Sequence, residues 1–454
     1  MLKSQIQVIG EKPSALALTS LFCWTFFHVN SKVRKVAKKK LEDVLDMYVF
    51  LALIDEWRYR KDPGLEKALM FCLENYSELS LTWPLLQKWL EGFKQKKIDW
   101  LFIKDISLNH IPADLFTLPG LKATPQVSII GAWIDKLPES ITELTQLKYL
   151  SLYNNSIRTA PSFLQKLPIK ELDLSSNYLT GVSRVIRNMT ALQKLDLGRN
   201  KIQKGYRYLT SLPSLKELDL RYNELKTLPE EMGDIMPLKK LNLDGNHIEQ
   251  GFETLAKLPK LDDLSLEVNS LKAVPDVIGN INTLKKLHLG SNQIEGGFEI
   301  FTQLTRLKEL DLAANHLTQM PKELVYIKNL KILWLNDNQL GAQVSAQGYA
   351  LPLEISYMDN LEELYLYNNS LRNLPPGIGL LDNLKTINLS KNKFSEFPVE
   401  LCELETLEEV SFEDNLIGRI PDDIRDLSQL RWINLRGNPL AGIRNHTQLF
   451  RYIL

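Results

Sequence analysis

The side chains that could perform chemistry are scattered along this chain. Its six histidines and its three cysteines, Cys23, Cys72 and Cys402, form neither a Cys-x-x-Cys motif nor a paired Cys/His metal pattern. The sequence also lacks the G-x-x-x-x-G-K-[ST], H-E-x-x-H and G-x-S-x-G motifs of nucleotide-binding proteins, metalloproteases and serine hydrolases. These observations predict a protein with no catalytic residues, no metal and no cofactor.

Another set of side chains is suited to binding a partner. Trp334 and Tyr365 fill the same position in two consecutive segments of the pattern L-x-x-L-x-L, and large aromatic residues dominate the binding energy of many protein interfaces. The residues predicted to contact a partner are Ile332, Trp334, Tyr365, Tyr367, His288 and Asp311. The alternative is that the aromatic rings stack on each other and only cover the surface beneath them.

Charged residues recur at matching positions. A possible acidic patch for a basic partner consists of Glu171, Asp173, Asp196, Glu217 and Asp219. A second set alternates in sign from segment to segment: Glu171, Lys194, Glu217, Lys240, Asp263, Lys286 and Glu309. Neighbouring strands of a sheet lie about 4.8 Å apart, so each charge in this set would have opposite charges beside it. We interpret the alternating set as structural, and for the acidic patch the alternative is a row of solvated aspartates.

A regular asparagine sets the spacing of all these positions. It recurs every 23 residues, with one interval of 22 and one of 31. The thirteen asparagines are Asn155, Asn177, Asn200, Asn223, Asn246, Asn269, Asn292, Asn315, Asn338, Asn369, Asn392, Asn415 and Asn438. The leucines before each asparagine alternate as in a short strand. An inward-pointing asparagine offers a donor and an acceptor to backbone groups of its own turn and of the next one, so we predict a structural asparagine ladder.

The segment after each asparagine has two forms. One carries an aliphatic residue and a proline, as in Leu228-Pro229, which favours an extended segment. The other carries glycine and an aromatic residue, as in Gly251-Phe252, and favours a short helix. The long interval after Asn338 contains eight extra residues (31 − 23), near 341–354. Such an insertion can mark a binding side, and the alternative is a tolerated surface loop.

The pattern L-x-x-L-x-L-x-x-N-x-L resembles the leucine-rich repeat. The resemblance implies an α/β solenoid over residues 98–454, a horseshoe of about 15 repeats with a parallel sheet on its concave side. The first two repeats are degenerate, because Ile106 and Ala132 replace the asparagine. The proline form is similar to intracellular leucine-rich repeat scaffolds that bind proteins of small-GTPase pathways, and the Gly-aromatic repeats depart from that group.

Residues 1–97 lack the repeat and predict an α-helical N-terminal cap domain. The segment 14–41 resembles one HEAT-type helical pair, with Val33, Arg34, Ala37 and Leu41 in matching places. Residues 14–29 (SALALTSLFCWTFFHV) are interpreted as a buried helix of this domain, and the alternative is an export signal. The six cations within residues 32–40 are interpreted as the solvated face of a helix.

Composition narrows the functional classes. The chain has 55 acidic and 55 basic residues, so net charge gives no indication of nucleic-acid binding or of membrane insertion. The absence of paired cysteines favours a reducing compartment, the cytoplasm. We therefore predict a monomeric, non-catalytic interaction module or scaffold that binds another protein on its concave face. The alternatives are an exported or surface recognition protein that binds a glycan or host ligand, and an enzyme hidden in the N-terminal domain.

Overall fold

The computed structural model describes residues 78–80, 100–104, 111, 115–117, 121–345 and 348–440. The chain divides into two compact units, residues 1–200 and 201–454, and each is described by itself. The predicted helical cap domain and its HEAT-like pair lie outside the described residues, apart from residues 78–80. No helix among the described residues is long and apolar enough to cross a membrane.

The first unit is built on short parallel strands that pair in the order in which they occur in the sequence. Its strands are β1 (Glu78–Ser80), β2 (Trp100–Lys104), β3 (Gln126–Ile130), β4 (Tyr149–Ser151), β5 (Glu171–Asp173) and β6 (Lys194–Asp196). β1 lies inside the range predicted as helical, so the sheet begins one strand earlier than residue 98. β2 and β3 are the strands of the two degenerate repeats. In the second of these repeats, Ala132 is fully buried in the place where later repeats have asparagine.

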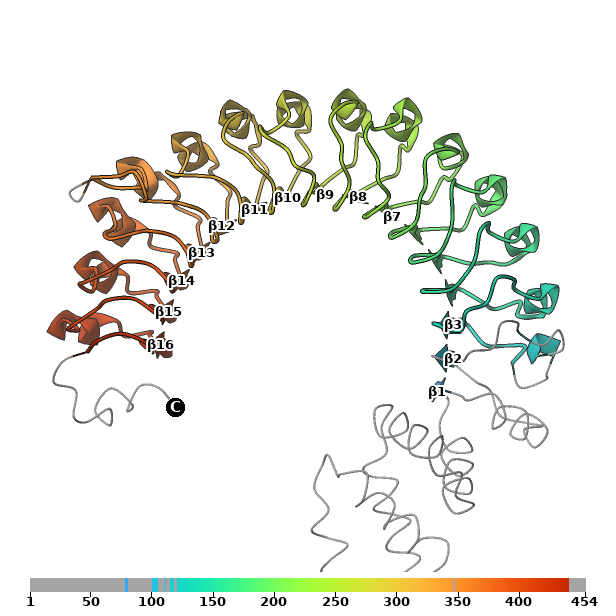
Figure 1. Ribbon diagram of the computed structural model, residues 1–454, viewed down its shortest axis with the longest axis horizontal. Coiled ribbons are helices and arrows are strands. Elements are labelled where there is room, and N and C mark those ends of the chain that lie inside the picture. The colour runs from blue at the N-terminus through green and yellow to red at the C-terminus, as the bar shows by residue number, and fades with distance from the viewer. Residues whose placement is uncertain are drawn as a thin grey trace, which may run out of the picture. The chain divides into compact units, whose positions relative to one another are not determined.

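The second unit continues the same pattern from β7 to β16. Its strands are β7 (Glu217–Asp219), β8 (Lys240–Asn242), β9 (Asp263–Ser265), β10 (Lys286–His288), β11 (Glu309–Asp311), β12 (Ile332–Trp334), β13 (Glu363–Tyr365), β14 (Thr386–Asn388), β15 (Glu409–Ser411) and β16 (Trp432–Asn434). Figure 1 shows these strands along the inner side of an arc, with short helices along its outer side. The strands therefore form the concave face of this unit.

The outer side carries short 3-10 helices wherever the chain is described. They are η1 (Leu115–Thr117), η2 (Glu139–Glu143), η3 (Ser162–Lys166), η4 (Arg184–Asn188), η5 (Tyr206–Tyr208), η6 (Glu230–Asp234), η7 (Phe252–Lys257), η8 (Asp276–Asn280), η9 (Phe298–Gln303), η10 (Lys322–Tyr326), η11 (Leu353–Tyr357), η12 (Pro376–Leu380), η13 (Val399–Glu403) and η14 (Asp422–Asp426). The helix predicted after Gly251 is η7.

The prediction of an extended segment after the prolines is wrong. Pro229 itself is extended (φ −65°, ψ 141°), but it is the N-cap of η6, and Pro275 stands in the same way before η8. Proline lacks an N–H and has a fixed φ, so it suits the start of a helix as well as an extended segment. The two forms of repeat thus differ in how the helix starts. In the glycine form, Gly251 is left-handed (φ 83°), and a Cβ there would lie 2.4 Å from the carbonyl oxygen of Leu228.

The core lies between the strands and the helices. The middle residue of each strand points inward, and Leu287, Leu310, Leu333 and Leu364 on β10–β13 are fully buried. Burying one leucine side chain contributes about 1.5–3 kcal/mol, and no single repeat could enclose its own. Stacking of repeats therefore leaves the first and third residues of each strand on the opposite, concave face.

The asparagine ladder connects each repeat with the one before it. The Asn246 Nδ2 donates to the carbonyl oxygens of Leu243 and Asp244 in its own turn and of Leu220 in the preceding repeat. Its Oδ1 accepts from the backbone N–H groups of Asn223 and Leu225, each at 3.0 Å. The sequence predicted bonds to the following turn, but the asparagine bonds to the preceding turn.

A residue in the left-handed conformation precedes every ladder asparagine. The thirteen left-handed residues, with φ between 50° and 77°, are Asn154, Ser176, Arg199, Tyr222, Gly245, Val268, Ser291, Ala314, Asp337, Asn368, Lys391, Asp414 and Gly437. Only two of them are glycines, although the left-handed region costs other L-residues about 1–2 kcal/mol. The bonds made by the following asparagine hold this turn in place in every repeat.

The eight-residue insertion leaves the ladder intact. Asn369 accepts from the Leu340 N–H at 2.9 Å and donates to the Leu335 carbonyl at 2.9 Å, as its equivalents do elsewhere. The extra residues leave the ladder at Gly341 (φ 86°) and return through Ala350, whose carbonyl accepts from the Met320 N–H. The insertion is therefore a projection on the side away from the strands.

Candidate functional site on the concave face of the second unit

The register of β10–β13 brings four of the predicted contact residues into one row. His288 pairs with Asp311, Asp311 with Trp334, and Trp334 with Tyr365. Each is the last residue of its strand and points to the concave face, where all four are half-buried. Residues 77 positions apart in the chain therefore form one continuous surface.

The two aromatic rings at the end of this row stack on each other. The Trp334 and Tyr365 ring centroids are 5.8 Å apart, and their planes differ by 6°. The Tyr365 hydroxyl donates to Glu363 Oε2 at 2.7 Å, which fixes the ring. Burial and this carboxylate both raise the pKa of Tyr365, so its hydroxyl stays protonated and remains a donor. Stacking and anchoring make the pair a rigid, flat surface.

The remaining members of the predicted group lie around the rings. Tyr367 is half-buried two residues beyond Tyr365, and burial together with the charges of Asp337 and Asp311 raises its pKa. Ile332, at the start of β12, pairs with Glu309 and Glu363 in the neighbouring strands. We call Ile332, Trp334, Tyr365 and Tyr367 the aromatic cluster.

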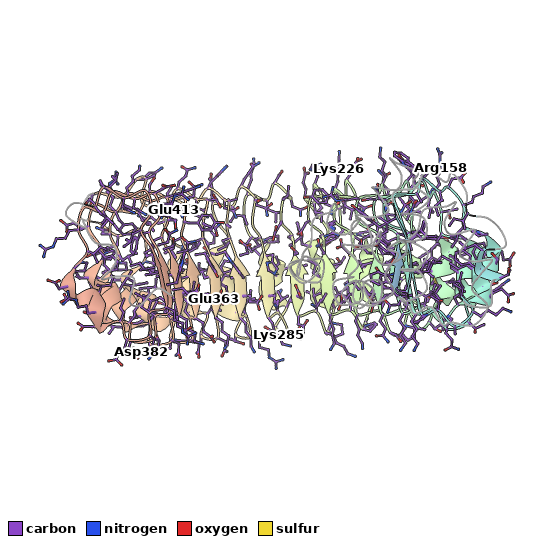
Figure 2. The ribbon with its side chains drawn as sticks, turned by 90° about the horizontal axis from the view of Figure 1, so that it is seen from below. Arg158, Lys226, Lys285, Glu363, Asp382 and Glu413 are labelled. Atoms are coloured by element: carbon purple, nitrogen blue, oxygen red, sulfur yellow. The ribbon has the colours of Figure 1, made fainter. Side chains whose placement is uncertain are left out.

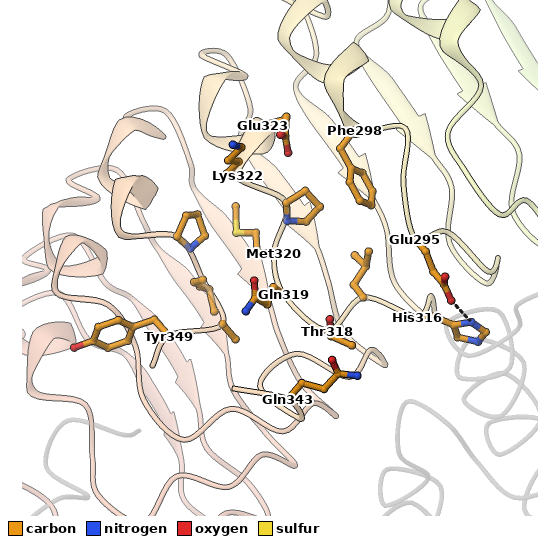
Figure 3. Close-up of a pocket in the computed structure, with 15 residues that line it drawn as sticks. Glu295, Phe298, His316, Thr318, Gln319, Met320, Lys322, Glu323, Gln343 and Tyr349 are labelled. Carbon is orange, nitrogen blue, oxygen red and sulfur yellow. Dashed lines mark ion pairs between the residues drawn. The ribbon is translucent and has the colours of Figure 1, made fainter. Parts of the chain in front are cut away.

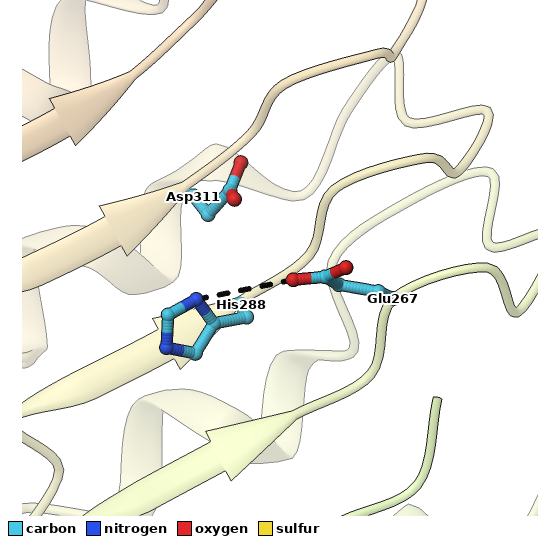
Figure 4. A group of neighbouring side chains, drawn as sticks. All are labelled: Glu267, His288 and Asp311. Atoms are coloured by element: carbon cyan, nitrogen blue, oxygen red, sulfur yellow. Dashed lines mark ion pairs between the residues drawn. The ribbon is translucent and has the colours of Figure 1, made fainter. Parts of the chain in front are cut away.

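A compact group of titratable side chains adjoins the aromatic cluster. One ligand-type atom from each of Glu267, His288 and Asp311 lies within 4.8 Å of the other two, and all three residues are half-buried. Figure 4 shows His288 and Glu267 facing each other, with Asp311 near them on the next strand; His288 Nδ1 lies 4.0 Å from Glu267 Oε1. The His288 ring also lies 6.3 Å from that of Trp334. We call Glu267, His288 and Asp311 the acid–histidine cluster.

The pKa of each carboxyl group in this cluster lies above its ordinary value. Burial raises the pKa of Glu267, and the negative charges of Asp244 and Asp311 raise it further, against the influence of His288. Burial also raises the pKa of Asp311, while the Ala313 N–H and His288 act in the opposite direction. No Lys or Arg among the described residues forms an ion pair with either carboxylate. Sequence reasoning included His288 and Asp311 but missed Glu267, which lies just beyond the end of β9.

The alternating charges behave differently. On β8–β11, Lys240, Asp263, Lys286 and Glu309 stand next to one another in register, and we call them the charge column. Lys240 Nζ lies 3.5 Å from Asp263 Oδ2, and Lys286 Nζ lies 2.7 Å from Glu309 Oε2. Each acidic residue of the charge column therefore has a lysine partner within the column. Figure 2 views the strands from below, with Glu363 over them and Lys285 and Asp382 toward one edge.

The predicted acidic patch falls in both units. In the first, Asp173 pairs in register with Asp196, and the Asp173 carboxylate accepts hydrogen bonds from Ser175 and from the Ser151 hydroxyl. In the second, Asp219 accepts from the backbone N–H of Arg221, and its carboxylate lies 3.5 Å from the Arg221 guanidinium. These oxygens already hold the turns that follow the strands.

A groove of about 600 Å³ lies beside the insertion. It is lined by Glu295 and Phe298 of one repeat, by His316 and Met320 of the next, and by Tyr349 of the insertion. Figure 3 shows these side chains around the opening, with His316 Nδ1 3.8 Å from Glu295 Oε1. The inserted residues form one wall of this groove. From the sequence, the insertion was expected to mark a binding side or to be a tolerated surface loop.

Models described as leucine-rich repeats match residues 207–248, 280–297, 360–381 and 382–440. The chain carries leucine-rich repeats. A search of curated protein sequences found no match.

Solved structures support the same fold. A leucine-rich repeat protein of Leptospira interrogans is 27% identical, with a TM-score of 0.62, over 83% of this chain and 98% of that one. The Toll–Spätzle complex of Drosophila gives 17% identity and a TM-score of 0.58, over 80% and 57% of the two chains. The TLR13–ssRNA13 complex gives 22% and 0.58, over 84% and 56%. The last two likenesses concern the fold alone, and together these matches establish a leucine-rich repeat solenoid.

Proposed function

We propose that this protein is a non-catalytic interaction module that binds a partner protein on the concave face of its second unit. Leucine-rich repeat folds serve as protein-interaction modules, and the repeats supply an open parallel sheet for this purpose. The observation that carries the proposal is the Trp334–Tyr365 stack at the end of the outward row. Rigid aromatic surfaces of this kind are typical anchors of protein interfaces.

The electrostatic surroundings favour a protein over a nucleic acid. The aromatic cluster is flanked by carboxylates, with Glu363 bonded to Tyr365, and Asp337 and Asp311 near Tyr367. A polyphosphate backbone would be repelled by them, since nucleic-acid binding depends on cationic contacts. One structurally similar protein is found in a complex with single-stranded RNA and another in a complex with Spätzle, and the acidic setting of this site supports the second kind of ligand.

The test compares two variants of the full chain on the same face. Trp334→Ala removes half of the stack, whereas Lys240→Ala removes a member of the charge column. Proteins captured from a native extract are quantified for each bait, and the affinity of every enriched protein is then measured with purified components. We expect Trp334→Ala to weaken binding by about 2 kcal/mol or more, and Lys240→Ala to leave it nearly unchanged. Binding lost with Lys240→Ala and kept with Trp334→Ala would move the interface to the charge column.

A cytoplasmic location is part of this proposal. The competing proposal is an exported recognition protein that binds a glycan or host ligand, and the likeness to the Toll–Spätzle complex motivates it. The N-terminal sequence of the native protein separates the two. Cleavage after residues 14–29 would support the exported protein, and an intact N-terminus would support the cytoplasmic one.

A further inference from the structure

The acid–histidine cluster has the composition of a metal site. One imidazole and two carboxylates meet on three successive strands, where His288 on β10 stands beside Asp311 on β11, and Glu267 follows β9. Their ligand atoms lie within 4.8 Å of one another (Figure 4). We propose that Glu267, His288 and Asp311 bind a divalent first-row transition-metal ion of the zinc type.

The groups around the cluster hold two of the three ligands in place. Asp244 Oδ1 accepts from the Glu267 N–H at 2.8 Å and from the Ser265 hydroxyl, which fixes the backbone that carries the glutamate. Asp311 Oδ1 accepts from the Ala313 N–H at 2.7 Å, which orients the carboxylate. Hydrogen bonds to a ligating carboxylate, such as the one from Ala313 to Asp311, orient metal ligands in proteins and raise affinity for the metal.

One glycine, Gly290, leaves room beside Asp311. Gly290 lies two residues beyond His288, and a Cβ at that position would approach Asp311 Oδ1 to 3.2 Å. The Trp334 ring lies 6.3 Å from the His288 ring. A larger residue at position 290 would therefore crowd Asp311, and the indole restricts the space open to the imidazole.

The charge around the cluster calls for a cation. Glu267 and Asp311 are half-buried near each other and near Asp244, and His288 is the partner closest to compensating them. In the charge column, two residues away along the same strands, each acidic residue instead has a lysine within 3.5 Å. A dication at the cluster would neutralise charge that the described residues leave uncompensated.

The donor set selects the class of metal. Calcium and magnesium prefer oxygen ligands throughout, whereas imidazole suits zinc and its first-row neighbours. Zinc with three protein ligands keeps one position open for water, and its ligand atoms lie about 3.3 Å apart in a tetrahedral site. The three ligand atoms, within 4.8 Å of one another, would have to approach by up to about 1.5 Å, which side-chain rotation can supply.

The experiment uses the full chain without an affinity tag, stripped with a chelator and then dialysed. Calorimetric titration with zinc chloride should show binding of one equivalent to the wild type, and titration with magnesium chloride should show none. His288→Ala should lower the zinc affinity by at least about tenfold. Asp311→Asn should lower the zinc affinity as well, because it removes a negative charge from the ligand set. The amide oxygen can still accept from the Ala313 N–H, so the local structure should be kept.

The matched control is His316→Ala. His316 also faces a glutamate, Glu295, at 3.8 Å, but no third ligand joins that pair among the described residues. This variant should bind zinc as the wild type does. Circular dichroism of each variant checks that loss of affinity is not loss of fold. Absence of zinc binding by the wild type, or equal affinity in wild type and His288→Ala, would overturn the proposal, as would a loss shared equally by His316→Ala.

Discussion

Two columns of side chains cross the same strands of the second unit on the same face. In one column the charges are paired, and in the other negative charge accumulates. In the charge column, opposite charges alternate, and lysines pair directly with their acidic neighbours. Two residues further along β10 and β11, and just beyond the end of β9, the acid–histidine cluster gathers two carboxylates and one imidazole. Burial raises the pKa of both carboxylates. The aromatic cluster continues that row onto β12 and β13.

The difference shows where neighbouring side chains on this surface compensate each other and where they do not. A parallel sheet places equivalent residues side by side, so a column is stable only if neighbouring repeats carry compatible groups. The charge column meets this condition by itself. The other row meets it at Trp334 and Tyr365 by stacking, but at Glu267 and Asp311 it concentrates negative charge. The part with uncompensated charge, the acid–histidine cluster, is where we expect a metal ion to bind.

The largest effect is expected from the ladder that supports both columns. Asn246→Leu removes five hydrogen bonds and leaves the N–H groups of Asn223 and Leu225 buried without acceptors. We expect a loss of at least about 3 kcal/mol in the free energy of unfolding. Chemical denaturation measures the loss, and hydrogen exchange should show it concentrated around residues 220–269.

The control for this variant is Asn438→Leu in the last described repeat. Asn438 is half-exposed, so water can replace part of its bonding and the loss should be smaller. Equal losses for the two asparagines would show that burial does not govern their contribution.

A smaller effect is expected from a charge reversal in the charge column. Lys286→Glu breaks the pair with Glu309 and places three acidic residues in a row with Asp263. The free energy of unfolding should fall by about 1 kcal/mol or less, and the loss should shrink in 1 M salt. The double variant Lys286→Glu/Glu309→Lys restores an opposite pair and should recover most of the stability. If it does not, the column is held by something other than charge pairing.

The smallest effect should be a gain in stability at the acid–histidine cluster. Because the folded state raises the pKa of Asp311 above its ordinary 3.8, the folded state binds this proton more tightly than the unfolded state does. The carboxyl group therefore costs stability at neutral pH, and that cost disappears as pH falls through the raised pKa. Asp311→Asn should be more stable than the wild type at pH 7, by less than about 1 kcal/mol, in metal-free buffer.

The pH dependence separates this effect from a change in packing. Thermal unfolding at pH 7 and pH 4 should show the advantage of Asp311→Asn shrinking at the lower pH, where the wild-type carboxyl is increasingly protonated. A variant that is less stable than the wild type at both values would mean that His288 already compensates the charge. The two columns would then be electrostatically alike.

Much of the fold could be predicted from the sequence because the repeat is strictly periodic. The period fixes the number of repeats, and the alternation of leucines fixes which strand residues point outward. The positions of Trp334, Tyr365, His288 and Asp311 on one face therefore followed from spacing alone. Residue type does not report backbone conformation equally well. Tyr222 and Val268 are left-handed, and neither residue type favours that region.

The sequence determined the repeat, the inward leucines and asparagines and the outward rows, since all of these depend on a fixed interval along one chain. Only the tertiary structure decided that Pro229 starts a helix, that Asn246 bonds to the preceding turn, and that Glu267 reaches His288. Glu267 and His288 lie 21 residues apart, just off the 23-residue period, because the glutamate belongs to the turn after its strand. Side-chain length and turn geometry bring them together, and neither is encoded in spacing.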